Sequence, residues 1–210
     1  MSYIVFGAGG HAKVVVEILR SRSETILGVM DDHSEEKVWN GLPVLGGANR
    51  IYELKVRYPD ALFLVAIGDN STRMSIVAQL DKAGIRYGTA VHPSAVVASD
   101  AALGEGTVVM PMAVINSAAE IGNHVIINTA ATVDHDCRIA NFTHISPGVN
   151  LAGGVKVGEA AHIGIGAALI PGVTVGADTI VGAASCVIRD LPDRVVAVGC
   201  PAKIIKNRKG

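Results

Sequence analysis

Residues 121–157 read IGNHVIINTAATVDHDCRIANFTHISPGVNLAGGVKV, and every sixth residue of this stretch, starting at Ile121, is Ile, Val or Leu. The series continues in both directions without a break, from Val91 to Val187, and contains seventeen aliphatic residues. Four residues after each of them lies a second column, which from Ala95 to Ser185 contains only Ala, Thr, Val, Cys or Ser. A helix repeats its apolar face about every 3.6 residues and a strand about every 2, so a period of six indicates a short strand and a tight corner, repeated.

Three such hexads make one triangular coil of eighteen residues, with the aliphatic side chains inside and the small ones at the corners. The pattern therefore predicts an all-β parallel β-helix built from hexapeptide repeats. We place this domain at residues 87–210, including a short C-terminal tail. Residues eighteen apart are expected to lie above one another in neighbouring coils.

The first 86 residues follow a different pattern, in which strand and helix signals alternate. Strands are predicted over 3–6, 25–30 and 61–67, and helices over 11–20, 48–58 and 71–83. The Gly- and Pro-containing stretch 41–47 is predicted to be a loop. This order predicts an α/β, Rossmann-like domain over residues 1–86, with a small, mostly parallel sheet covered by helices.

A glycine-rich turn, GAGGHA at residues 7–12, follows the first predicted strand and opens the first predicted helix. It fits the G-x-G-x-x-A pattern, in which backbone N–H groups at a helix N-terminus hold phosphate. Asp31 and Asp32 close the second strand and would suit ribose hydroxyls or a base edge. The third strand ends in a polar loop, GDNSTR at residues 68–73, at the sheet edge where ligands bind. Alone, this set fits NAD, a sugar nucleotide or a plain tight turn.

The composition narrows the possible partners and compartment. The net charge is -1, with 18 basic and 19 acidic residues, so binding to nucleic acid through its phosphates is not expected. The three cysteines, Cys137, Cys186 and Cys200, lack CxxC spacing and indicate neither a disulfide framework nor a zinc site. We see no leader segment and no apolar run of about 20 residues, and we expect a cytoplasmic protein without membrane association.

Several histidines fall on the outside of the predicted coils. His144 and His162 are eighteen residues apart and should stack about 5 Å apart, at a cost that favours at least one neutral ring. His135 lies between Asp134 and Asp136, and a neighbouring carboxylate can fix an imidazole tautomer and raise its basicity. Taken alone, His135 fits a surface residue better than a base, because an outward-facing histidine on a β-helix is more often a surface residue. His124 is predicted to lie at a solvated corner.

Four segments, in order along the chain, resemble a known family. They are GAGGHA at 7–12, AIGDNSTR at 66–73, VDHDCRIANFTHISPGVNLAGGV at 133–155 and GCPAK at 199–203. The set is similar to that of bacterial sugar acyltransferases related to the sialic acid O-acetyltransferases. It is most similar to the N-acetyltransferases that act on nucleotide-linked 4-amino-4,6-dideoxy sugars. The resemblance implies a left-handed β-helix, acetyl-CoA as co-substrate, no metal, and a homotrimer with active sites between neighbouring subunits.

The resemblance also implies roles for single residues. His135 falls on the family's general base and Asp136 on the acidic residue that orients it, although many relatives have Glu there. The positions on the side of the sugar nucleotide are Gly9, Gly10, His11, Asp31, Asp32, Gly68, Asn70, Arg73 and Asn128. The positions on the side of acetyl-CoA are His144, Gly153, Ile165 and Lys203.

The sequence thus predicts an acetyl-CoA-dependent N-acetyltransferase of bacterial surface glycan biosynthesis. It would transfer the acetyl group directly to a nucleotide-linked 4-amino-4,6-dideoxy sugar, with a histidine as general base. One alternative is an O-acetyltransferase that modifies sialic acid or another sugar hydroxyl. A second is a carbonic-anhydrase-like β-helix with metal-binding histidines, of which the one-coil spacing of His144 and His162 is a faint sign. A third is a sugar-nucleotide-binding scaffold without catalytic activity.

Overall fold

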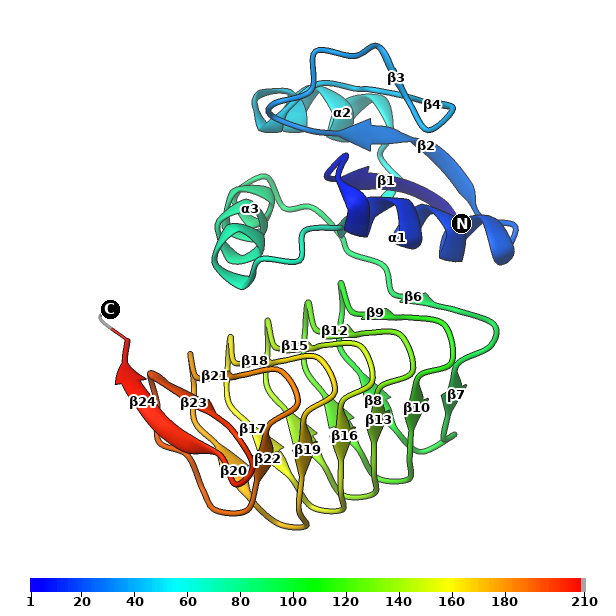
Figure 1. The fold of residues 1–210 in the computed structure, drawn as a ribbon. Helices are drawn as coiled ribbons and strands as arrows, with labels where there is room; N and C mark the ends of the chain where they lie inside the picture. The colour runs from blue at the N-terminus through cyan, green and yellow to red at the C-terminus, as the bar shows by residue number, and fades with distance from the viewer. Residues whose placement is uncertain (209–210) are drawn as a thin grey trace. The chain divides into compact units, whose positions relative to one another are not determined.

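The chain forms two compact units, Met1–Pro93 and Ser94–Gly210. The computed structural model describes residues 1–208. Figure 1 shows that the first unit mixes helices and strands, whereas the second is a stack of coils. Both predicted fold classes, the α/β unit and the β-helix, are therefore confirmed.

The first unit contains a three-stranded sheet in the order β2-β1-β5, with all strands parallel. Its elements are β1 (Ser2–Phe6), α1 (Gly10–Ser21), β2 (Thr25–Met30), β3 (Val38–Trp39), β4 (Leu42–Pro43), η1 (Ala48–Arg50), α2 (Ile51–Arg57), β5 (Leu62–Val65), α3 (Asn70–Lys82) and β6 (Ala90–Val91). The central strand is almost fully buried, since Ile4 and Val5 are inaccessible to solvent. This rigid centre fixes the carboxyl ends of the three strands, where the predicted ligand residues lie.

Two local features of this unit differ from the sequence prediction. The stretch predicted to be a loop contains one strand of a short hairpin, in which β3 pairs antiparallel with β4. The predicted helix over 48–58 is divided into a 3-10 turn and the α-helix Ile51–Arg57. The carboxylate of Asp32 accepts a hydrogen bond from the N–H of Ala48 at 2.7 Å, which ties that first turn to the end of β2.

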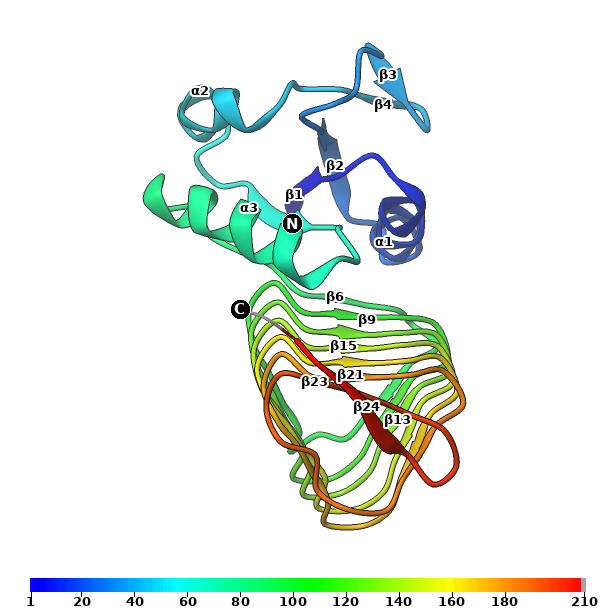
Figure 2. The ribbon, with the colours of Figure 1, turned by 60° about the vertical axis from the view of Figure 1, so that its left-hand side comes forward.

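The second unit winds through three parallel sheets, seen along different directions in Figures 1 and 2. One sheet contains β7 (Val96–Val97), β10 (Val114–Ile115), β13 (Thr132–Val133), β16 (Asn150–Leu151), β19 (Ala168–Leu169) and β22 (Cys186–Val187). The next contains β8 (Ala102–Leu103), β11 (Glu120–Ile121), β14 (Arg138–Ile139), β17 (Lys156–Val157) and β20 (Thr174–Val175). The third contains β9 (Val108–Val109), β12 (Ile126–Ile127), β15 (His144–Ile145), β18 (His162–Ile163), β21 (Ile180–Val181), β23 (Val195–Val198) and β24 (Lys203–Asn207).

The register of these sheets follows the period of the sequence. Thr132 aligns with Val114 on one side and with Asn150 on the other, so each step between coils is eighteen residues. The aliphatic column is buried at every position from Val109 to Val187. The column of small residues is also buried, which lets the corners close tightly around the core. The predicted stacking is confirmed.

The corners are made by a third column, in which every sixth residue from Gly106 to Ala184 has a positive φ angle. This left-handed conformation costs little for glycine and is tolerated by Asp and Asn, but it strains other residues. Asp136 occupies one such corner with φ 59°. The side chain of Asp136 is 68% exposed at this corner, immediately after His135.

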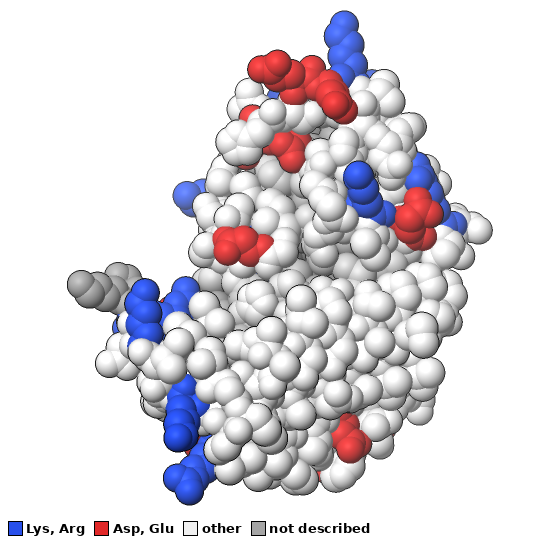
Figure 3. All heavy atoms as spheres, in the orientation of Figure 1, with Lys and Arg blue, Asp and Glu red and all other residues white. Residues whose placement is uncertain are grey.

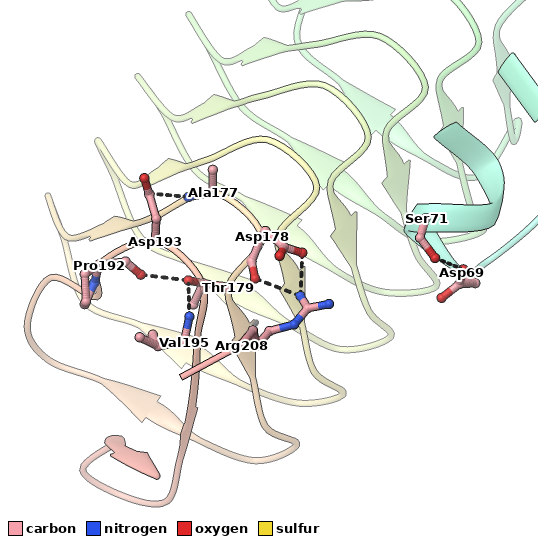
Figure 4. A network of polar contacts seen from close by, with 9 residues as sticks. All are labelled: Asp69, Ser71, Ala177, Asp178, Thr179, Pro192, Asp193, Val195 and Arg208. Carbon is pink, nitrogen blue, oxygen red and sulfur yellow. Dashed lines mark hydrogen bonds and ion pairs between the residues drawn. The ribbon is translucent and has the colours of Figure 1, made fainter. Parts of the chain in front are cut away.

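The end of the β-helix is closed by an antiparallel pair, β23 and β24. Figure 4 shows that this closure is anchored to the last coil, where Arg208 donates hydrogen bonds to the carbonyl and carboxylate oxygens of Asp178, at 2.7 and 2.6 Å. The carboxylate of Asp193 accepts from the N–H of Ala177 at 2.7 Å. On the face in Figure 3, Lys and Arg side chains gather near β24, and most of the β-helix surface in view carries no charge.

Candidate functional site

His135 follows β13 at a corner of the β-helix, with its side chain 62% exposed. Its Nδ1 lies 2.7 Å from Oδ2 of Asp136, and its backbone N–H donates to Oδ1 of Asp134 at 2.8 Å. The hydrogen bond that His135 donates to Asp136, followed by the charge of Asp134, raises the pKa of His135 above 6.5. Because Asp136 holds Nδ1, Nε2 is the nitrogen that can take a proton from a substrate. The pair thus has the geometry of an oriented general base.

Gly153 lies directly beside this imidazole, one coil further along the chain. A Cβ atom built on Gly153 would come within 2.6 Å of both Cε1 and Nε2 of His135. The next residue, Gly154, donates its N–H to the carbonyl oxygen of His135 at 2.9 Å. The absence of a side chain at Gly153 therefore leaves the space that the His135 ring occupies.

A second cluster is centred on His144. This residue lies on β15 and is only 9% exposed. Its Nε2 lies 3.0 Å from Nδ2 of Asn128. The orientation of the Asn128 amide is fixed because its Oδ1 accepts the N–H of Thr129 at 2.8 Å. Nδ2 is thus the group that faces His144, and it can only donate. Nε2 of His144 must accept, which places the ring proton on Nδ1 and makes the imidazole neutral.

His162 extends this cluster by one coil. Its ring stacks on that of His144 with centroids 4.7 Å apart, which confirms the predicted column. Nε2 of His162 lies 2.9 Å from the hydroxyl of Ser146, which is itself almost fully buried. A neutral His144 avoids the charge repulsion that two stacked imidazolium rings would suffer.

Cys137 is a further group in this region that could act as a nucleophile, and it faces the interior. It is completely buried, and its thiol donates to the carbonyl oxygen of Ala152 at 3.2 Å. Burial raises the pKa of the Cys137 thiol. A buried, protonated thiol is a poor nucleophile, so the geometry favours direct transfer over a covalent acyl-enzyme.

In the first unit, the glycine loop leads into α1, whose N-cap Gly9 has no side-chain cap. A Cβ added at Gly9 or Gly10 would meet no atom within 4 Å, so the space over this helix N-terminus is open. A hollow of about 700 Å³ lies here, lined by Ala8, Gly9, Asp31, His33, Ser34, Glu35, Glu36 and Trp39. Helix N-termini favour phosphate groups, and a hollow of this size accommodates a nucleotide.

Asp31 and Asp32 are both engaged with backbone groups around this hollow. Asp31 accepts the N–H of Ala8 and the N–H of His33, each at 2.8 Å. Asp32 caps the turn at Ala48 as described above. The structure therefore gives these carboxylates a part in shaping the loops, and their predicted contacts to ribose or base stay a prediction.

The loop after β5 is organised by Arg73, a charged residue that is only 1% exposed. Its guanidinium donates to the carbonyl oxygens of Ile67 and Gly68, at 2.9 and 3.2 Å, and to Oδ1 of Asn70 at 2.7 Å. Burial lowers the pKa of Arg73 to about 10, still well above neutral. Arg73 is thus a cation inside the unit that holds the loop in shape.

His11 adjoins this buried cation. Burial, and then the charge of Arg73, lowers the pKa of His11 to about 4. The imidazole is therefore neutral at physiological pH. The structure brings His11, Gly68, Asn70 and Arg73 into one electrostatic neighbourhood, with a neutral ring beside a fixed positive charge.

Of two further residues predicted for the acetyl-CoA side, Ile165 lies three residues after His162, whereas Lys203 lies in the closing pair of strands at the end of the β-helix. Ile165 follows β18 and is 60% exposed, and Lys203 is the exposed first residue of β24. A hollow of about 700 Å³ lies over the β-helix, on the outer face of β11, β14 and β17. The residues that line this hollow include none of the predicted site residues. We therefore do not include this open groove in the candidate site.

Sequence reasoning missed some residues and misplaced one. Trp39 and His33 line the hollow in the first unit, but the hairpin that carries Trp39 has strands of two residues, too short to give a periodic signal. His124 lies at a corner as predicted, with φ 55°, but the prediction that it is solvated was wrong, because this residue is 5% exposed and stacks on Phe142 at 5.1 Å. The eighteen-residue spacing of the two rings was the signal that could have indicated this stack.

Two features are absent from residues 1–208. Within this range, no three His, Cys, Asp or Glu side chains come together as a metal-binding group. Within the same range, the helices are all too short or too polar to cross a bilayer.

Comparisons with known proteins agree on one family. Residues 3–80 match the PglD N-terminal domain. UDP-N-acetylbacillosamine N-acetyltransferase of Bacillus subtilis (strain 168) is 44% identical over 106 residues, which span 48% of this chain and 47% of that protein. A histidine variant of perosamine N-acetyltransferase from Caulobacter crescentus, solved with CoA and GDP-perosamine, is 46% identical with a TM-score of 0.93, and covers 99% of this chain and 98% of its own. The acetyltransferase domain of PglB from Neisseria gonorrhoeae FA1090, solved with acetyl coenzyme A, is 36% identical with a TM-score of 0.91, covering 97% and 98%.

Proposed function

The chain belongs to the family of acetyltransferases that act on nucleotide-linked amino sugars, and we propose that it transfers the acetyl group of acetyl-CoA to the amine of such a sugar. The finer proposal is a nucleotide-linked 4-amino-4,6-dideoxy sugar as acceptor, in surface glycan biosynthesis in the bacterial cytoplasm. The observation that carries the chemistry is the His135–Asp136 pair, with Nδ1 held at 2.7 Å and Nε2 left as the basic nitrogen.

The reaction requires one proton to move in each half. The sugar amine attacks the thioester carbonyl carbon, and a C–N bond forms while Nε2 of His135 takes the amine proton. The tetrahedral intermediate then breaks its C–S bond, and the departing CoA thiolate receives a proton from His135. Asp136 keeps the ring oriented and stabilises the imidazolium between the two steps. A general base of this kind contributes roughly 10²–10⁴-fold to the rate.

The oxyanion of the intermediate needs a donor, and His144 has the right protonation for it. Asn128 fixes the neutral tautomer with the proton on Nδ1, so that His144 serves as a hydrogen-bond donor rather than as a base. A donor that is already oriented before the reaction gains more from the developing charge than one that must reorganise. We assign Asn128 the role of positioning this ring, and Gly153 that of giving His135 its space.

His135 and His144 lie on different sides of one β-helix. They are half a coil apart, His135 at the corner after β13 and His144 on the outer side of β15. A thioester that meets both rings would therefore have to lie between two copies of the chain. This supports a homotrimer in which neighbouring subunits complete each active site, with Ile165 and Lys203 on the acetyl-CoA side.

The first unit supplies the sugar-nucleotide site in this proposal. The open N-terminus of α1 suits the diphosphate, and the neutral His11 beside Arg73 suits a polar contact to the sugar. A nucleotide sugar fits this site better than NAD does, because acyl transfer has no use for a hydride carrier. The alternative of O-acetylation would use the same base on a hydroxyl group.

The bond in the product separates the two reactions. The purified protein is incubated with acetyl-CoA and a nucleotide-linked amino sugar, and the acetylated product is treated with alkaline hydroxylamine, which cleaves acetate esters but leaves amides intact. The proposal predicts a product of unchanged mass after treatment. Loss of the acetyl group would instead assign the protein to the O-acetylating branch.

A further inference from the structure

Two cysteines that take no part in the proposed reaction lie together at the end of the β-helix. Cys186 begins β22, and Cys200 lies in the turn between β23 and β24. Both are free thiols, Cys200 exposed and Cys186 partly exposed. Cys137, by contrast, is buried in the core.

The hydrogen-bond register makes the two cysteines direct neighbours. In this β-helix, Ala168 donates its N–H to the carbonyl oxygen of Ser185, and Ala168 aligns with the following residue, Cys186. Cys186 donates its own N–H in the same way to the carbonyl oxygen of Gly199, at 3.0 Å. By this rule, Cys186 aligns with the residue after Gly199, which is Cys200.

The carbonyl group of Cys186 is also paired with this turn. Pro201 has no N–H to give, and Ala202 donates instead to the carbonyl oxygen of Cys186 at 2.8 Å. The turn therefore takes the place of the next strand over β22. Neighbouring strands lie about 4.8 Å apart, inside the roughly 4.4–6.8 Å that a disulfide spans between Cα atoms. The thiols of Cys186 and Cys200 are also close enough to interact by a hydrogen bond.

We propose that Cys186 and Cys200 are a redox-sensitive pair, which forms a reversible disulfide with a low-molecular-weight disulfide such as oxidised glutathione. The thiolate of Cys200 attacks oxidised glutathione, forms a mixed disulfide and releases one glutathione thiolate. The thiolate of Cys186 then attacks the Cys200 sulfur and releases the second. Two electrons pass from the protein thiols to oxidised glutathione, and two protons are released to the glutathione thiolates.

The order of these steps follows from the surroundings of the two thiols. Burial raises the pKa of the Cys186 thiol, so that the exposed Cys200 reacts first with the small disulfide. The resulting bond would tie the Gly199–Ala202 turn to β22. It would thereby hold the closing strand β24, which exposes Ile204 and Ile205, against the last coil.

The test uses the full-length protein, reduced and then treated with oxidised glutathione. We expect the intact mass to fall by that of two hydrogen atoms, and a digest to contain a linked Cys186–Cys200 peptide. Cys137→Ser should behave like the unmodified protein, whereas Cys200→Ser should give no internal disulfide. Two stable glutathione adducts on the unmodified protein, or no reaction at either cysteine, would overturn the proposal.

Thermal unfolding provides a second readout. A disulfide that closes the loop between Cys186 and Cys200 should raise the Tm of the oxidised protein by at least about 5 °C over that of the reduced protein. Treatment should leave the Tm of Cys186→Ser unchanged. An equal rise in this variant would show that oxidation acts elsewhere in the chain.

Discussion

Replacement of Gly153 by alanine should disable the general base without touching it directly. A Cβ at this position would lie 2.6 Å from Cε1 and Nε2 of His135, whereas ordinary contact begins at 3.4 Å. The imidazole must therefore retreat by about 0.8 Å, and the 2.7 Å bond from Nδ1 to Asp136 must stretch or break. A misplacement of about 1 Å can cost on the order of 10²-fold in rate, and we expect kcat of Gly153→Ala to fall by that amount.

The fold should survive this change. Gly153 does not have a positive φ angle, and His135 is exposed enough for its ring to swing into solvent. Thermal unfolding should therefore place the Tm of the variant within a few degrees of the unmodified protein. The rate is measured by release of free CoA thiol from acetyl-CoA, and the KM for acetyl-CoA is determined in parallel.

A double-mutant cycle with His135→Ala separates two explanations of a slow variant. If Gly153 acts by making room for the imidazole, Gly153→Ala should have no further effect once the imidazole is gone. The resemblance to the family instead places Gly153 on the acetyl-CoA side, where it would contact that co-substrate. If the substitution raises the KM for acetyl-CoA equally in both backgrounds, our reasoning about His135 is refuted.

Three further predictions rest on single contacts. Asp136 raises the pKa of His135, so Asp136→Asn should reduce the rate and move the acid limb of the profile of kcat/KM against pH to lower pH. Asp134→Asn keeps the hydrogen bond from Nδ1 of His135 and should shift this limb less. Equal pH profiles of the two variants would contradict this prediction. His11 has a pKa of about 4 in the folded protein and an ordinary value of 6.5, so the unfolded chain takes up the proton first as the pH falls. The free energy of unfolding, measured in urea, should therefore fall by about 3 kcal/mol between pH 7 and pH 4. This fall should be absent in His11→Asn. Asn128→Asp replaces a donor by a carboxylate and should protonate His144, which ¹⁵N shifts of the ring would report; an unchanged neutral tautomer would rule out the positioning role.

Much of the β-helix was predictable because its physics repeats. An inward aliphatic residue and a small corner residue must recur with every hexad, so a single chain shows the pattern many times over. The same arithmetic aligned His144 with His162, and it would also have aligned His135 with Gly153 had it been applied there. Where the pattern occurs once, as in the two-residue strands β3 and β4, the sequence offers no periodicity to detect.

The site was predictable in residue identity but not in protonation or in contacts. Adjacent residues such as His135 and Asp136 are bound to be near each other, and the left-handed corner at Asp136 then aims the carboxylate at the ring. Arg73 is different, because a charged residue is expected on the surface and only the fold reveals three acceptors around it. The neutral state of His144 depends on the direction of one amide, which no sequence pattern records.

The most direct test of the proposed function is the release of free CoA thiol from acetyl-CoA in the presence of candidate acceptors. The acceptors are UDP-, dTDP- and GDP-linked 4-amino sugars, together with free and CMP-linked sialic acid. Our account predicts fast release with one of the amino sugars, and none with either form of sialic acid. Release with sialic acid alone, or no release with any acceptor, would contradict it.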